Sequence, residues 1–334
     1  GREKGRGLVK FGWSDALADK EYFFKIPRTM SAAEVEGWRR TERPPGPLPD
    51  LRLYCTPDKL ICPLYDPSGF VAGLQIAFPV DEFESPTFKP ETRFTKWSTS
   101  NGEGDPPRDY WAITQYYVSE ESLKAGAGPQ VENGATLQDG GVWVKDFDNQ
   151  LTRIPSTEAE LNSTHFKKQN CIPNMGKQLG YLDVRKVVFM ILYMTPPWSS
   201  RGFDSRGLIS MKPATVTETA LAVIIIDMSL SINCKLQGTH YYYNMTKEKR
   251  CEDLLPWFAL TTRGDLVGVG FQVFAKFTPK VKGREWFEIL EKSQGQAEVA
   301  IPLGPECLYK LSATYPVISL HIYFIDNPWN IRCR

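Results

Sequence analysis

The chain has 334 residues, 42% of them hydrophobic, which is enough to bury the core of one large domain or of two with about 150 residues each. Its formal net charge is +1, from 40 basic and 39 acidic residues, so no overall field draws it to nucleic acid or anionic lipid. The longest apolar run, residues 220–226, is shorter than the roughly 20 residues that cross a bilayer, so we expect neither a nucleic-acid partner nor a membrane span.

The N-terminal 50 residues are predicted to form an arm before the folded body. The first seven are basic and glycine-rich without an apolar stretch, which is typical of a processed or engineered start. Ser31 and Glu34 form a capping box, which predicts a short helix to about Arg40. The prolines within 44–49 then exclude both a helix and a central strand, so we expect a stiff connector there.

Residues 51–168 are predicted to form a first β-rich subdomain. Asp66–Gly69 has the composition of a tight turn, and it separates the strand around Pro63–Tyr65 from the apolar run Phe70–Phe78. Tyr110–Val118 is rich in residues that favour strands. The order of these segments predicts a hairpin followed by a further strand.

Residues 169–334 are predicted to form a second β-rich subdomain. A capping box at Thr157–Glu160 predicts a polar helix just before it. Val184–Met194 and Thr217–Ile232 have the composition of buried strands, although the second run is apolar enough to be a buried helix instead. Pro316–Ile325 is predicted to be the last strand.

Two parts of the chain share a pattern. Residues 63–73 and 256–268 both contain a proline and an aromatic residue, a turn ending in glycine, an apolar pair, and a second glycine four residues on. The strands downstream can be aligned so that Gln115 occupies the place of His321. One interpretation is a duplication that packs two β-rich halves about a pseudo-twofold axis with a central cleft; the other is two ordinary hairpins.

The cysteines and glycosylation sequons favour an extracellular protein. Sequons begin at Asn162 and Asn244, and the cysteines are widely spaced with no Cys-x-x-Cys pair, which argues against a zinc cage and for disulfides. The alternative is a cytosolic protein with buried thiols. An odd number leaves one thiol unpaired or in an intermolecular bridge, and the disulfide candidates are Cys55, Cys62, Cys171, Cys234, Cys251, Cys307 and Cys333.

The residues around His240 are the best candidates for chemistry. Only three histidines occur, and His240 and His321 lie in the most β-rich parts of the second half, where they would act together as a base or as metal ligands. Tyr241 and Tyr243 would share one strand face, and with Trp257, Tyr323 and Gln115 they would line a pocket for a flat organic substrate. The alternative is that these side chains are structural and fill β-sheet cores.

Common catalytic motifs do not occur in the sequence. It contains no dinucleotide-binding Gly-x-Gly-x-x-Gly after a strand, no P-loop and no Gly-x-Ser-x-Gly elbow. We therefore expect no nucleotide cofactor and no resident metal, and molecular oxygen as co-substrate if the protein is an enzyme.

The second half of the chain contains a series of distinctive blocks: Cys171–Gly176, His240–Tyr243, Cys251 with Pro256–Phe258 and Gly264–Gly268, Pro305–Leu308 and Ser319–Phe324. Together these blocks resemble a pattern in uncharacterised secreted proteins of invertebrates. The resemblance covers about the last 165 residues, and the chain is also similar in size and compartment to the luciferases of syllid fireworms, although no defining motif of theirs is matched. The second resemblance implies oxidation of a heterocyclic substrate by oxygen in an aromatic, water-excluding pocket, with a histidine or tyrosine as base.

Together these observations predict a predominantly β (α+β) fold with two β-rich, duplicated halves about a central cleft and a few short helices. The expected function is that of a secreted, monomeric, oxygen-using oxidoreductase of luciferase type with His240 and His321 as its catalytic residues. The alternative is a non-catalytic secreted protein that binds a small organic molecule.

Overall fold

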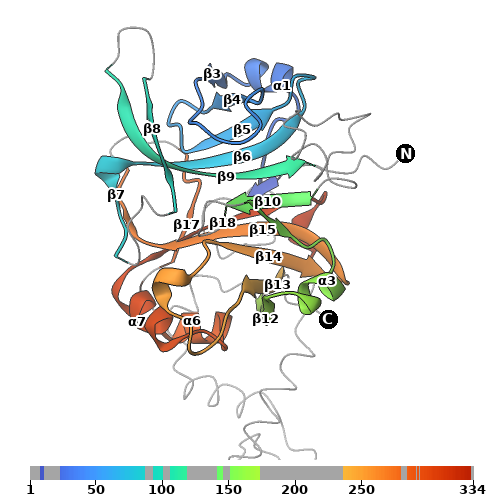
Figure 1. Ribbon diagram of the computed structural model, residues 1–334, viewed down its shortest axis with the longest axis vertical. Helices are drawn as coiled ribbons and strands as arrows, with labels where there is room; N and C mark the ends of the chain where they lie inside the picture. Colours follow the sequence, from blue (N-terminus) through green and yellow to red (C-terminus); the bar gives the residue numbers. More distant parts are fainter. Residues whose placement is uncertain are drawn as a thin grey trace, which may run out of the picture. The chain divides into compact units, whose positions relative to one another are not determined.

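The computed structural model describes residues 8–10, 23–86, 93–100, 106–118, 141–145, 151–173, 236–279, 284–290, 292 and 294–331. All of them belong to one compact unit, made of residues 1–174 and 235–334. This unit consists mainly of antiparallel strands with a few short helices, so the predominantly β fold is confirmed (Figure 1). The strands predicted at Val184–Met194 and Thr217–Ile232 lie outside the described residues.

The first sheet has the strand order β11-β10-β9-β6-β5-β4-β3, and β8 also pairs with β9. Its strands are β3 (Arg39–Thr41), β4 (Arg52–Cys55), β5 (Ile61–Tyr65), β6 (Val71–Pro79), β8 (Thr95–Thr99), β9 (Arg108–Val118), β10 (Gly141–Lys145) and β11 (Leu151–Ile154).

The second sheet has the order β12-β13-β14-β15-β18-β1-β2, and β17 also pairs with β18. Its strands are β1 (Leu8–Lys10), β2 (Phe23–Lys25), β12 (Phe166–Pro173), β13 (Leu236–Tyr243), β14 (Trp257–Thr262), β15 (Asp265–Phe274), β17 (Glu288–Leu290) and β18 (Val317–Tyr323). A small ribbon joins β7 (Phe83–Glu84) to β16 (Lys276–Phe277).

The two sheets repeat one topology. Strands β3 to β6 correspond to β12 to β15, β9 to β18, β8 to β17, and the hairpin β10–β11 to the N-terminal hairpin β1–β2. The strands of the first sheet run from blue to green in Figure 1, and β13, β14, β15 and β18 of the second sheet are yellow to red. The N-terminal segment therefore completes the sheet built by the C-terminal part of the chain.

Each repeat also begins with a short helix, α1 (Met30–Val35) or α3 (Glu158–Ser163). A threonine, Thr29 or Thr157, caps each helix by accepting a backbone N–H. The first cap therefore lies two residues before the predicted Ser31, and the second lies at the predicted residue.

The β-ladders give the exact correspondence between the halves. A β-bulge follows the pair Leu64–Gly73 in the first sheet and the pair Leu260–Gly268 in the second. Gly73 then pairs with Tyr116, and Gly268 pairs with Tyr323. Counting back along β9 and β18 from these pairs matches His321 with Thr114, and Gln115 with Ile322.

The sequence alignment that placed Gln115 at His321 is therefore one residue out. Because side chains alternate between the faces of a strand, that single step moves Gln115 to the opposite face of its sheet.

The inner faces of the two sheets share one buried core. Phe78 of the first sheet lies 6.0 Å from Phe271 of the second and 4.8 Å from Phe287, measured between ring centroids. Tyr241 and Trp257, two of the predicted substrate-binding residues, belong to the same buried cluster. Aromatic and aliphatic side chains thus fill the interface where we expected a cleft.

Two disulfides are formed within the described residues. Cys55–Cys62 joins β4 to β5, and Cys251–Cys307 joins a 3-10 turn to α7 (Glu306–Thr314). The other candidates lie outside the description: Cys234 and Cys333, and the side chain of Cys171. Among the described helices, none has the length and apolar character that a membrane span requires.

The predicted domain boundaries at 50/51 and 168/169 stay predictions. Strand β3 of the first sheet precedes the first boundary, and β12 of the second sheet runs across the second.

We expect Gly73 and Gly268, which occupy equivalent positions in the two sheets, to be essential for stability. A Cβ on Gly268 would lie 2.5 Å from the carbonyl oxygen of Ile322, and one on Gly73 would lie 2.6 Å from that of Gln115. Either change to alanine should therefore lower the free energy of unfolding in urea by about 1–3 kcal/mol. Gly295→Ala in α6 (Gln294–Ala300) meets no atom within 4 Å and should cost nothing. Equal effects at the three positions would contradict the close approach of the strands.

Candidate functional site

The structure brings the two predicted catalytic histidines together. His240 on β13 and His321 on β18 are separated in the sheet by β14 and β15. Their side chains nevertheless meet, with 3.4 Å between the two Nε2 atoms. Both project from the outer face of the second sheet.

Glycine on the intervening strand makes this meeting feasible. Gly270 pairs with Phe258 on one side and with His321 on the other. A Cβ on Gly270 would overlap the Phe258 ring, so the ring lies over the glycine. The Phe258 centroid is then 5.0 Å from that of His240 and 5.5 Å from that of His321. Tyr323 stacks on His321, so rings surround the pair.

Polar groups lie next to both nitrogens of each imidazole. Nδ1 of His240 lies 3.0 Å from the carbonyl oxygen of Gly238, so this nitrogen donates and Nε2 keeps its lone pair. Nδ1 of His321 lies 3.3 Å from Oε1 of Glu288. Nε2 of His321 therefore faces His240, and its Nδ1 faces Glu288.

Burial, however, separates this cluster from solvent. His240 is 1% exposed, His321 4% and Glu288 0%. Burial, reinforced by the neighbouring His321, lowers the pKa of His240 to about 3, so its imidazole is neutral at pH 7. A substrate would have to displace packed side chains to reach either ring.

The remaining predicted site residues do not join this cluster, except for Tyr323. Tyr241 and Trp257 lie in the core between the sheets, and Gln115 is fully buried in the first sheet. Tyr243 is partly buried, and its ring packs 5.5 Å from Phe166. The predicted set is thus divided between the two faces of the second sheet and a strand of the first. No three His, Cys, Asp or Glu side chains in the described parts of the chain converge as metal ligands.

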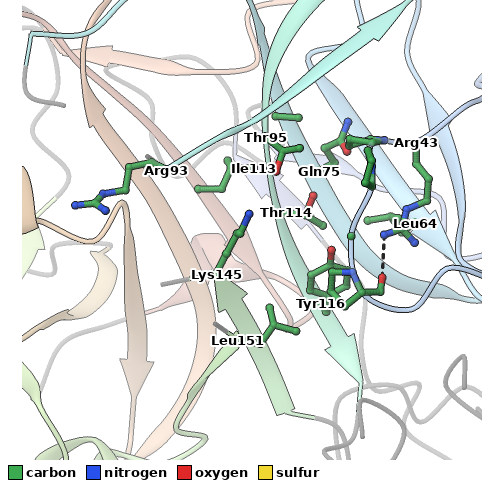
Figure 2. Close-up of a pocket in the computed structure, with 15 residues that line it drawn as sticks. Arg43, Leu64, Gln75, Arg93, Thr95, Ile113, Thr114, Tyr116, Lys145 and Leu151 are labelled. Carbon is green, nitrogen blue, oxygen red and sulfur yellow. Dashed lines mark hydrogen bonds between the residues drawn. The ribbon is translucent and has the colours of Figure 1, made fainter. Parts of the chain in front are cut away.

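A pocket of about 190 Å³ lies on the outer face of the first sheet. We call it the outer pocket; the loop 43–47 and residues of β5, β6, β8, β9, β10 and β11 line it (Figure 2). Arg43 holds the loop in place, because its guanidinium donates to the carbonyl oxygens of Pro47 and Leu48. Leu64, Ala112 and Leu151 supply apolar surface.

The polar lining of the outer pocket includes a lysine, two arginines and the amide of Gln75. Lys145 extends from β10 alongside Thr114 of β9, whereas Arg93 turns away from the other labelled side chains (Figure 2). Burial lowers the pKa of Lys145, and within the described residues its ammonium group has no hydrogen-bond or ion-pair partner. Gln75 is 1% exposed, and its amide nitrogen has no acceptor in the described part of the chain.

Sequence reasoning missed this pocket. The available signals were a lysine at the end of the short strand Val142–Val144 and a proline-rich loop preceded by arginine, but neither shows which sheet face it covers. The two predicted glycosylation residues, Asn162 and Asn244, are both exposed, as an acceptor asparagine must be.

No family model, curated protein or solved structure matches this chain. Its function must therefore be argued from the geometry.

The buried histidine should make folding pH-dependent. Unfolded His240 takes up a proton as the pH falls below about 6.5, whereas folded His240 resists protonation down to a pKa of about 3. The contribution of His240 to the free energy of unfolding is therefore intact above pH 6.5, and acidification to pH 4 lowers it by on the order of 3 kcal/mol. Urea unfolding between pH 8 and pH 4 measures this. His240→Gln should flatten the dependence, and His165→Gln, an exposed control, should keep it; identical profiles for the two variants would contradict the assignment.

Proposed function

We propose that this chain is an extracellular binding protein that holds a small organic molecule in the outer pocket. The observation that carries the proposal is the pocket itself, a concave site enclosed by an anchored loop and lined by apolar side chains with a few polar groups. This composition is typical of small-molecule sites.

The volume sets the size of the ligand. A volume of about 190 Å³ is what roughly six molecules of liquid water occupy. It can hold a compact organic molecule of about ten non-hydrogen atoms. Drug-sized ligands and extended chains are too large to be enclosed.

The compartment follows from the covalent chemistry. Both disulfides need an oxidising environment to persist, and two exposed sequon asparagines suit the secretory route. We therefore place the protein outside the cell.

The oxygen-using oxidoreductase of luciferase type is the second candidate. The meeting of His240 and His321 beneath aromatic rings favours it, since a base next to a second imidazole suits proton abstraction. It requires a substrate to reach rings that are 1% and 4% exposed. The outer pocket needs no such opening, which is why binding is the first candidate.

Filling the pocket tests the proposal. Thr95 lines it, and Thr99 lies on the same strand and the same side but beyond it. We expect saturation-transfer NMR with benzoate, benzamide, butyrate and butyramide to detect at least one ligand of the wild-type protein. Thr95→Phe should abolish that signal, whereas Thr99→Phe should keep it.

Two results would overturn the binding function: no ligand binds the wild-type protein, or both variants bind as it does. Light emission or oxygen consumption that His240→Gln removes would support the second candidate instead.

A further inference from the structure

We infer that the ligand of the outer pocket carries a carboxylate, which lies against Lys145 and the amide of Gln75. This inference rests on the proposed binding function and adds the chemical class of the ligand. The charge of the lining points to it: of the lining residues that the structure describes, three are basic and none is acidic. The whole chain has a net charge of only +1, so this is a local concentration of positive charge.

Of the three cations, Lys145 is the one that can serve a ligand. The guanidinium of Arg43 is engaged by carbonyl oxygens of its own loop, and Arg93 donates to the carbonyl oxygen of Glu252. Lys145 is partly buried with no partner among the described residues, which is unfavourable for a charged group. An anion in the pocket would compensate the Lys145 ammonium group for the hydration that it loses on burial.

Donors on three neighbouring strands form one row. Gln75 of β6 pairs with Thr114 of β9, and Lys145 follows the Val144–Gln115 pair of β10 and β9, so it lies beside Thr114. The amide nitrogen of Gln75 is buried without an acceptor among the described residues, which is unfavourable for a hydrogen-bond donor. The two oxygens of a carboxylate can accept from an ammonium and an amide at once.

The second half of the molecule carries a carboxylate at the position that corresponds to Thr95. Thr95 pairs with Ala112, and Glu288 pairs with Ser319, the residue that corresponds to Ala112. Thr95 therefore stands where the second half has Glu288. There the carboxylate is built into the chain and lies 3.3 Å from His321, the counterpart of Thr114. In the first half Thr95 supplies no carboxylate at this position, and a ligand can supply one.

The rest of the ligand faces Leu64, Ala112 and Leu151, which favours an apolar body. The inferred class is thus a small monocarboxylic acid with an aliphatic or aromatic body, of about ten non-hydrogen atoms in all.

Matched acids and amides test the class. Acetate, butyrate and benzoate are titrated against acetamide, butyramide and benzamide, which have the same shape without the charge. For at least one pair the acid should bind the wild-type protein at least tenfold more tightly. Lys145→Met should weaken that acid about tenfold and change the amide less than twofold. Lys168→Met, which removes an exposed lysine, should change neither.

A carboxylate supplied by the chain gives a second test. Thr95→Glu should weaken the acid at least tenfold relative to Thr95→Gln, which has the same size and no charge. Circular dichroism confirms the fold of each variant.

The outcomes separate this inference from the proposed function. One outcome would overturn the inferred carboxylate and still support the binding pocket. In that outcome the amides bind as tightly as the acids, Lys145→Met changes neither affinity, and Thr95→Phe abolishes the binding of both. Failure of all six compounds to bind the wild-type protein would overturn both.

Discussion

The register of the central hairpin decides which side chains meet in both halves of this molecule. In each half a leucine pairs with a glycine just before a β-bulge. The glycine is required because the neighbouring strand's carbonyl oxygen comes within 2.5–2.6 Å of where a Cβ would stand. A slip of one residue would send the core residues to solvent and the pocket residues into the core. The core between the sheets and the outer pocket both depend on this local constraint.

Equivalent places on the two outer faces are filled differently. The disulfide Cys55–Cys62 stands where the second half pairs Tyr242 with Phe258. Leu53 stands where the second half has His240. At these equivalent positions the second outer face carries rings and the first carries smaller groups. The same backbone thus supports a packed cluster in one half and a pocket in the other.

The sequence predicted what depends on neighbouring residues. The hairpins, the Thr157 cap and the repeat all follow from local patterns of proline, glycine and apolar residues. The predicted register failed at Gln115, because composition alone does not determine which residues of β9 and β18 pair with the glycines of the neighbouring strands. The outer pocket was missed because a loop, two hairpins and β8 assemble it from distant positions.

The small number of histidines suggested that His240 and His321 form an accessible catalytic site, but both side chains are buried. His240 and His321 do meet, but their nitrogens face each other, a backbone carbonyl and Glu288. The contact between the two rings links β13 to β18 across two intervening strands, while Nδ1 of His321 has no hydrogen-bond partner in the described part of the chain. A buried cluster of this kind favours one strand arrangement, because any other would separate its polar groups from one another. In the first half Lys145 and the amide nitrogen of Gln75 have no partner among the described residues and line a pocket, and that difference makes the first half the better candidate for binding.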